Sequence, residues 1–175
     1  VHDPRLVWNT FDIVEQYQGI AVQSKSGHAF IKDVMREHNA VYGGEMSAHH
    51  YFRDFAYCDS GMIPWLLTIA LLSETGQSLS TLVENMITKF PCSGEINFKV
   101  ADTQATVQKI FDHYADQNPL VDRTDGVSLD FGAWRLNVRA SNTEPLLRLN
   151  IESRADQNPQ PMQHYVDELT GLIQG

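Results

Sequence analysis

The chain has 175 residues, enough for one or two domains, and its hydrophobic content of 42% can supply a core. Its formal charge of -9, from 13 basic and 22 acidic residues, argues against a general surface for nucleic acid or anionic membrane, since both need clustered Lys and Arg. Any anionic ligand must then be captured by local charge. The longest strongly apolar stretch, 62–72, is too short to span a bilayer, and no signal peptide opens the chain.

These features predict a cytoplasmic protein that binds neither nucleic acid nor membrane. Cys58 and Cys92 lie far apart in the sequence and form no Cys-x-x-Cys pattern. We interpret them as free thiols of a reducing compartment, with a disulfide between them as the alternative.

The first part of the chain alternates helix and strand patterns. Asp3 as a cap and Pro4 as the first helical residue predict a helix that ends near Gly19. The next elements predicted are a strand at 20–23, a helical stripe at 30–35, a strand at 40–42, and helices at 60–73 and 78–90. This β-α-β order is typical of an α/β domain.

A dense polar segment follows the second of these strands, directly after the Gly43-Gly44 break. Open parallel α/β sheets bind ligands beyond the carboxyl ends of their strands, so segment 45–49 lies where a binding loop is expected. It offers the carboxylate of Glu45, the hydroxyl of Ser47 and the imidazole of His49. Donors and acceptors this close together suit vicinal sugar hydroxyls, although without further support they would be ordinary loop residues.

The character of the chain changes after segment 91–94, which we interpret as a linker. A small α+β module is predicted beyond it, with a helix capped by Thr103, strands at 95–100, 127–131, 134–138 and 147–151, and a final helix at 162–173. Segment 139–145 then becomes a hairpin-like connection held by sheet at both ends.

That connection combines the guanidinium of Arg139 with the small polar residues Ser141, Asn142 and Thr143. Such a turn can aim backbone N–H groups at one phosphate while the arginine makes a two-pronged contact. The alternative is a turn that is merely capped by its own side chains.

Two segments resemble signature loops of the alpha-D-phosphohexomutase superfamily, specifically its bacterial phosphomannomutase/phosphoglucomutase branch. Gly-Glu-Met-Ser at 44–47 resembles the sugar-reading loop of the third domain, and Arg-Ala-Ser-Asn-Thr-Glu-Pro at 139–145 resembles the phosphate loop of the fourth. Lys25-Ser26-Gly27-His28 resembles a further third-domain element whose histidine contacts substrate. The resemblance implies a partial three-layer α/β/α domain with a mixed sheet at 1–92, and a small α+β domain with an antiparallel sheet flanked by helices at 93–175.

The resemblance also implies the binding residues. The substrate-binding set is Glu45, Met46, Ser47, Ala48, His49, His28 and Arg5, and the phosphate-binding set is Arg139, Ala140, Ser141, Asn142, Thr143 and Arg148. Met46 can equally serve packing, Arg5 can be a surface arginine, and strand alternation leaves the face of Arg148 open. A metal site built from the adjacent pair His49-His50 is not expected, because neighbouring residues of an extended segment point to opposite faces.

The superfamily's phosphoserine motif Ser-His-Asn-Pro and magnesium loop Asp-Gly-Asp do not occur in these 175 residues. The chain therefore resembles the C-terminal part of a four-domain mutase, with no catalytic residue of its own, and its third domain is expected to lack an opening strand and helix. By the resemblance, the parent enzyme interconverts mannose 6-phosphate and mannose 1-phosphate through a hexose 1,6-bisphosphate, with Mg²⁺ and the missing N-terminal domains. Alternatives are a phosphoglucomutase acting on glucose phosphates, or a non-catalytic binding or interaction module.

Overall fold

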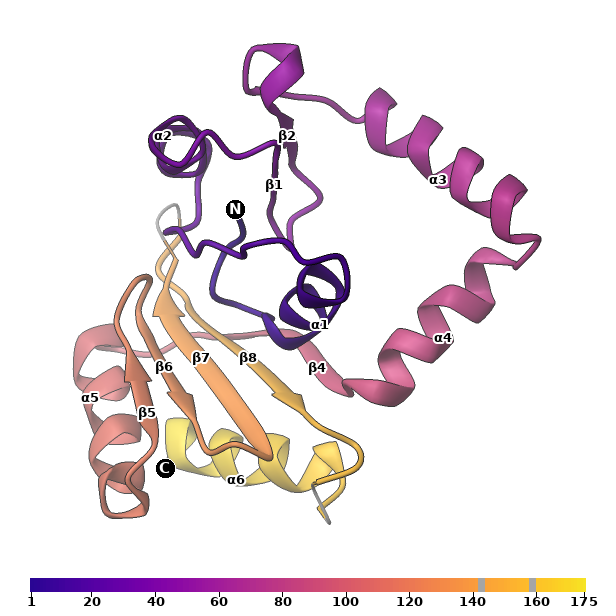
Figure 1. Ribbon diagram of the computed structural model, residues 1–175. Helices are drawn as coiled ribbons and strands as arrows, with labels where there is room; N and C mark the ends of the chain where they lie inside the picture. The colour runs from indigo at the N-terminus through magenta and orange to yellow at the C-terminus, as the bar shows by residue number, and fades with distance from the viewer. Residues whose placement is uncertain (142–143, 158–159) are drawn as a thin grey trace. The chain divides into compact units, whose positions relative to one another are not determined.

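The computed structural model describes residues 1–141, 144–157 and 160–175, which form two compact units, Val1–Ile87 and Thr88–Gly175 (Figure 1). The fold is mixed α/β, with a three-stranded antiparallel sheet in the first unit and a five-stranded antiparallel sheet in the second. This confirms the predicted fold class. Within the described ranges, no helix combines the length and hydrophobicity needed to cross a bilayer.

The elements of the first unit are α1 (Trp8–Gln16), α2 (His28–Glu37), β1 (Tyr42–Gly44), β2 (His50–Phe52), η1 (Arg53–Phe55), β3 (Cys58–Asp59), α3 (Met62–Thr75) and α4 (Leu79–Lys89), whose last residues enter the second unit. Those of the second unit are β4 (Cys92–Phe98), α5 (Thr103–Tyr114), η2 (Ala115–Gln117), β5 (Leu120–Asp122), β6 (Val127–Asp130), β7 (Trp134–Ala140), β8 (Leu147–Ser153) and α6 (Met162–Gln174).

In the first unit, α2 packs on β1 through a small core of Ile31, Met35 and Tyr51, all fully buried. Strands β1, β2 and β3 form an antiparallel meander. Beside it, His2 makes parallel bridges to both Gln23 and Gly44. The opening residues thus lie extended between two other segments, joined to them by isolated parallel bridges outside the antiparallel strands.

The start of the first helix was predicted wrongly. Asp3 does not cap a helix at Pro4; α1 begins at Trp8, because the carboxylate of Asp3 is engaged by Arg5 and by the backbone of Met46. The Gly43-Gly44 pair lies inside β1 rather than after it. Residues 45–49 therefore turn the chain from β1 into the antiparallel β2, not into a helix.

Helices α3 and α4 have strongly apolar sequences but remain accessible along their whole length. Every residue of both helices is exposed or half-buried. The large apolar side chains exposed on them are Met62, Trp65, Leu66, Leu67, Ile69, Leu71, Leu79, Val83, Met86 and Ile87.

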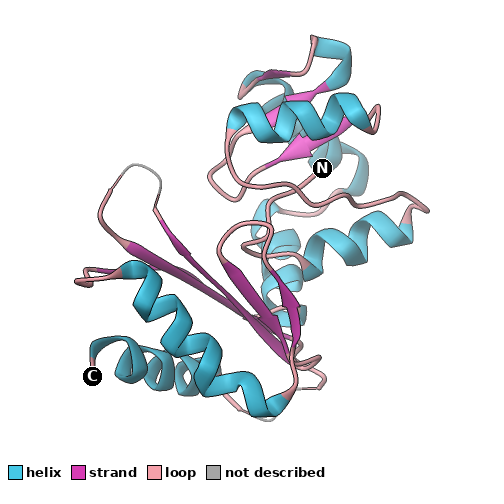
Figure 2. Cartoon of the chain, turned by 90° about the vertical axis from the view of Figure 1, so that its left-hand side faces the viewer, coloured by secondary structure: helices cyan, strands magenta, loops and turns pink. Residues whose placement is uncertain are grey.

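In the second unit the strand order is β4-β8-β7-β6-β5, and α5 and α6 cover one face of that sheet (Figure 2). Strand alternation places Trp134, Leu136 and Val138 of β7 in the core with both helices. The cap of α5 is Asp102, which accepts the Ala105 amide at 3.0 Å, so the predicted cap at Thr103 was one residue late.

Segment 91–94 is part of the sheet, contrary to its interpretation as a linker. The Ser153 amide donates to the Pro91 carbonyl, the Asn150 side chain to the Gly94 carbonyl, and the Ile151 amide to Ser93 Oγ. A bulge between Cys92 and Glu95, where Gly94 has φ of +68°, fits one extra residue of β4 into the ladder. The domain boundary predicted at 92/93 stays a prediction; the compact units divide at 87/88.

Candidate functional site

The turn from β1 to β2, residues 45–49, is called here the Glu45 loop. The Glu45 amide donates to the His49 carbonyl at 2.9 Å, and the Ala48 amide donates to the Glu45 carbonyl at 3.0 Å. Ala48 has φ of +64°, in the left-handed region that non-glycine residues seldom occupy. Such strain persists only where surrounding contacts impose it, so the loop has a defined shape.

The carboxylate of Glu45 is buried and held at both oxygens. Oε2 accepts the Gly27 amide at 3.0 Å, and Oε1 accepts the Tyr51 hydroxyl at 2.5 Å. Burial, followed by the hydrogen bond and negative charge of Glu45, raises the pKa of Tyr51, so its hydroxyl keeps the proton that it donates. Since a carboxylate has about four acceptor positions, Glu45 can still accept hydroxyl groups of a ligand.

A buried ion pair also holds the loop. Nη2 of Arg5 lies 2.6 Å from Oδ2 of Asp3, and both side chains are nearly inaccessible. The same Oδ2 accepts the Met46 amide at 2.8 Å, while Arg5 also donates to Oγ of Ser47 at 3.3 Å. Burial alone would raise the pKa of Asp3, but the hydrogen bond and charge of Arg5 and two backbone amides lower it below its usual value.

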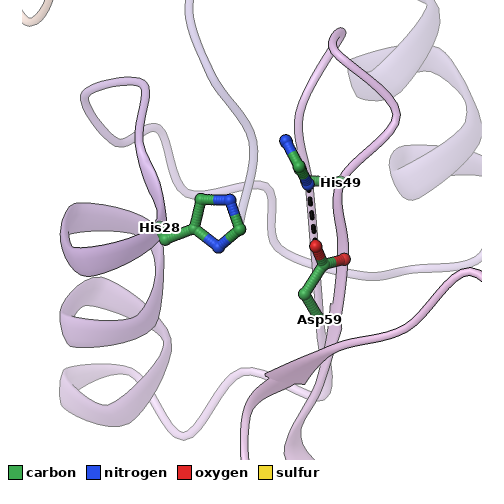
Figure 3. A group of neighbouring side chains, drawn as sticks. All are labelled: His28, His49 and Asp59. Atoms are coloured by element: carbon green, nitrogen blue, oxygen red, sulfur yellow. Dashed lines mark hydrogen bonds and ion pairs between the residues drawn. The ribbon is translucent and has the colours of Figure 1, made fainter.

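Two histidines and a carboxylate meet at the last residue of the loop, His49, as Figure 3 shows. Nδ1 of His49 lies 2.7 Å from Oδ2 of Asp59, and the rings of His28 and His49 are 4.3 Å apart between centroids. Oδ1 of Asp59 accepts the His50 amide at 2.9 Å. Burial acts to raise the pKa of Asp59, but the hydrogen bonds from His50 and His49 and the positive charge of the nearby imidazoles lower it.

In the second unit, the candidate phosphate loop connects β7 to β8, as predicted. Arg139 and Arg148 are directly paired across these strands, and we call them the arginine pair. Both approach the carboxylate of Glu95 on β4, with 3.5 Å from each guanidinium to one of its oxygens, and Arg148 also donates to Glu144 at 3.1 Å. The open question of which face carries Arg148 is answered: it lies beside Arg139.

The hairpin between these strands is closed by the Ser141 amide, which donates to the Leu146 carbonyl at 2.8 Å. Oγ of Ser141 accepts the Glu144 amide at 3.3 Å, so this serine does cap the turn, whether or not it binds a ligand. Ala140 is the last residue of β7. Asn142 and Thr143, two of the predicted phosphate contacts, lie outside the described residues.

Strand β7 is closely approached by Gly126, which has φ of +74°. A Cβ at this position would lie 2.3 Å from the Val138 carbonyl oxygen and 2.5 Å from Cβ of Arg139. Only glycine fits there, because any side chain would collide with β7. Gly126 therefore allows the turn to lie directly against the backbone at Arg139.

Within the first unit, the predicted residues form two groups at the Glu45 loop. Arg5 contacts Ser47, while Tyr51 links Glu45 to His28, whose ring lies against His49. The side chain of Met46 is exposed. Four residues that contact the two candidate sites were not predicted as site residues from the sequence. They are Asp3, Tyr51, Asp59 and Glu95. Asp3 was noticed but interpreted as a helix cap, and the other three stand in segments without a local motif.

Comparison with known families agrees with both units. The model for phosphoglucomutase/phosphomannomutase alpha/beta/alpha domain III matches residues 1–90, and that for the phosphoglucomutase/phosphomannomutase C-terminal domain matches residues 95–169. Together they match more than half of the chain.

Curated relatives carry related names. A protein of Xanthomonas campestris pv. campestris named "Phosphohexose mutases" is 61% identical over 175 residues, which are 100% of this chain and 39% of that protein. A phosphomannomutase of Vibrio cholerae is 56% identical over 174 residues, 99% of this chain and 37% of that protein. The chain thus spans less than two-thirds of the length of these relatives.

Solved structures show the same fold. A phosphoglucomutase/phosphomannomutase family protein of Burkholderia thailandensis superposes with a TM-score of 0.74 at 22% identity, covering 99% of this chain and 37% of that one. An N-acetylphosphoglucosamine mutase of Aspergillus fumigatus gives 0.63 at 13% identity, covering 99% and 37%.

Proposed function

The chain belongs to the phosphoglucomutase/phosphomannomutase family, and from that premise we propose that it supplies sugar recognition and phosphate binding to a phosphomannomutase. The single observation that supports this most is the Glu45 loop. Its carboxylate, hydroxyl and imidazole are fixed by contacts from outside the loop while keeping acceptor positions for a ligand. Fixed acceptors of this kind suit a polyhydroxylated ligand, because hydroxyl groups are recognised by direction.

The sugar role is proposed for Glu45, Ser47, His49 and His28, with Arg5 close to Ser47. When Nδ1 of His49 carries the proton donated to Asp59, its Nε2 is an acceptor for a sugar hydroxyl. Ser47 is exposed and its hydroxyl can donate as well as accept. The residues thus offer acceptors and donors close together.

The phosphate role is proposed for the arginine pair, together with Ala140, Ser141, Asn142 and Thr143. Two guanidinium groups side by side can bind a phosphate through forked, charge-assisted hydrogen bonds. The arginine pair supplies local positive charge on a chain whose net charge of -9 does not favour a phosphorylated ligand.

The reaction we propose for the longer protein interconverts mannose 6-phosphate and mannose 1-phosphate through a phosphoserine and a hexose 1,6-bisphosphate, upstream of GDP-mannose. The sugar must bind in two opposite orientations, so its hydroxyl groups and its phosphate need separate fixed sites. Phosphoryl transfer depends on positioning and charge, and this chain would supply positioning only. We expect the 175-residue chain alone to bind without turnover.

Mg²⁺ does not fit the residues present. The ion prefers an octahedral set of oxygen ligands, whereas the metal-type grouping found among the described residues contains two imidazoles and one carboxylate. We therefore assign no step of this chain to Mg²⁺. The proposed location is the cytoplasm, which two free and exposed cysteines support.

Mannose is preferred over glucose in this proposal because Gly-Glu-Met-Ser resembles the loop of the mannose-using branch. By the same resemblance, the glucose-specific branch more often has a second acid in place of Met46. A phosphoglucomutase remains the alternative, as does a module that binds sugar phosphates without catalysis in any longer protein. Titration with mannose 1-phosphate and, separately, glucose 1-phosphate distinguishes the two sugars.

The test is an NMR titration of the chain with mannose 1-phosphate. We expect shifts of the amides at 45–49 and at 139–141, lost for the second group in Arg139→Ala and strongly weakened in Arg139→Lys, which keeps the charge but not the fork. Arg123→Ala is the control, because Arg123 is an exposed arginine of the same unit. Unchanged spectra of the unmodified chain at millimolar ligand would contradict the proposal.

A further inference from the structure

The cluster beside the Glu45 loop has the composition of a transition-metal site. His28 begins α2, His49 lies in the turn before β2, and Asp59 ends β3, so three separate elements converge (Figure 3). Each residue offers one ligand atom, and these atoms all lie within 4.8 Å of one another. We propose that His28, His49 and Asp59 bind a divalent transition metal ion, with Zn²⁺ as the best match.

The ligand chemistry selects this class of ion. Two imidazole nitrogens and one carboxylate oxygen suit Zn²⁺, Co²⁺ or Ni²⁺ and do not suit Mg²⁺ or Ca²⁺, which take oxygen ligands. Three protein ligands also leave a fourth tetrahedral position open for water or a ligand atom. The grouping differs from the one considered from sequence, since His50 turns away and hydrogen-bonds to Tyr42.

The geometry requires small adjustments. Bonds of about 2.0–2.2 Å in a tetrahedral site place ligand atoms about 3.4 Å apart, so separations of up to 4.8 Å must shorten by up to about 1.4 Å. The 2.7 Å contact between Nδ1 of His49 and Oδ2 of Asp59 must open by about 0.7 Å. His28 is exposed at the first position of its helix, and rotation of its side chain can supply the shortening. The ion would replace the proton that His49 and Asp59 share.

The surroundings already orient the ligands. Oδ1 of Asp59 is held by the His50 amide at 2.9 Å, leaving Oδ2 directed at His49. The ring of Tyr51 packs edge-on against His28, with centroids 5.4 Å apart, and Tyr51 is itself fully buried. Outer contacts that fix a carboxylate and a ring are the usual companions of metal ligands.

A metal bound here would occupy the same imidazoles that the proposed sugar site uses. It would therefore oppose sugar binding rather than assist it, and this consequence alone rests on the proposed function. The metal site itself does not, because its ligands come from one unit and need no phosphosugar.

The test uses the 175-residue chain with Cys58→Ser and Cys92→Ser in every sample, because two exposed thiols are competing Zn²⁺ ligands. Isothermal titration with ZnCl₂ measures affinity, and the visible absorption of added CoCl₂ reports tetrahedral coordination. We expect binding of one ion per chain. His28→Asn and His49→Asn should each weaken it by about 100-fold or more, since outer-shell changes alone cost about 10–100-fold.

His50→Asn is the matched control, because His50 is adjacent to His49 but faces Tyr42. Its Zn²⁺ affinity should lie within about twofold of that of the chain carrying only the two Cys→Ser substitutions. This change is well below the loss of about 10–100-fold that follows the removal of an outer-shell contact. Because His28 is exposed, its variant keeps the fold, which far-UV circular dichroism checks. Equal affinity in His28→Asn and its background would overturn the site, as would equal losses in the His49 and His50 variants. Both readouts stand even if the chain binds no sugar phosphate.

Discussion

The Glu45 loop and the arginine pair are held in opposite ways. The carboxylate of Glu45 is fixed by two donors within 3.0 Å, and the Met46 amide is fixed by Asp3. The arginine pair instead shares the carboxylate of Glu95, at 3.5 Å from each guanidinium. Binding of hydroxyl groups depends on the direction of each hydrogen bond, so the groups that bind them must be held in fixed positions. A phosphate needs less rigidity, because it can compete with a carboxylate for guanidinium groups that are already paired.

The largest expected effect tests the rigidity of the Glu45 loop. Asp3→Asn removes the charge of a buried ion pair, so the free energy of unfolding of the first unit should fall by about 3–5 kcal/mol. Urea unfolding, followed through NMR signals of each unit separately, measures the loss. Asp54→Asn is the control: Asp54 pairs with Arg53 at the exposed surface, and its loss should cost at most about 1 kcal/mol.

The same pair predicts a dependence on pH. Because its folded-state pKa is lowered, Asp3 contributes stability that is present above about pH 4 and is lost as the pH falls through the lowered pKa. Asp59 acts in the same direction. Urea midpoints of the first unit at pH 7 and pH 3 should therefore differ less in Asp3→Asn than in the original chain. An identical difference in both would contradict the role of Asp3.

The next effect tests how the arginine pair is positioned. Gly126→Ala adds a Cβ 2.3 Å from the Val138 carbonyl at a positive φ, which should cost about 2–4 kcal/mol through strain and overpacking. Displacement of β7 should also weaken phosphate binding at Arg139. Gly132→Ala separates the two causes, since Gly132 has φ of +82° but nothing near its Cβ, and should cost about 1–2 kcal/mol with phosphate binding unchanged.

A smaller effect returns to Glu45. Tyr51→Phe removes the hydroxyl that donates to Oε1, which should destabilise the first unit by about 1.5–3 kcal/mol because the acceptor is charged. Tyr42→Phe deletes a hydroxyl that contacts His50 at an exposed position and should cost about 0.5 kcal/mol. Equal losses of unfolding free energy in Tyr51→Phe and Tyr42→Phe would show that the hydrogen bond to Glu45 contributes no more than one at the surface.

The smallest effect concerns Glu95. Glu95→Gln removes the negative charge beside both arginines, so inorganic phosphate should bind more tightly, by up to about fivefold. Isothermal titration or phosphorus NMR measures the change. A weaker binding in Glu95→Gln would mean that Glu95 positions the arginine pair rather than competing with the phosphate.

The parts of the fold that follow from short-range pattern were predictable. Strict alternation along 134–138 and 147–151 placed the core of the second unit and the hairpin between β7 and β8. Both candidate loops were also located from their composition. In each case the signal lies within a few residues, which is the range over which sequence rules for turns and strands operate.

The predictions that were wrong concern segments whose contacts lie far away in the sequence. Asp3-Pro4 has the local signature of a helix start, but the carboxylate is used by Arg5 and by Met46, which is 43 positions away. Segment 91–94 has a linker composition, but it pairs with residues more than 50 positions later. Asp59 has no local signature at all and becomes visible only when β3 lies beside His49.

The contact between Asp3 and Met46 has a consequence for the order of folding. It joins residues 43 positions apart, and Glu45 reaches Gly27 across 18 positions, so the loop acquires its shape only after long stretches of chain have been closed. Contacts of such high sequence separation form late, because their loop-closure entropy must be overcome first. The geometry of the proposed sugar site thus depends on complete folding of the first unit, and a partly folded chain would not present it.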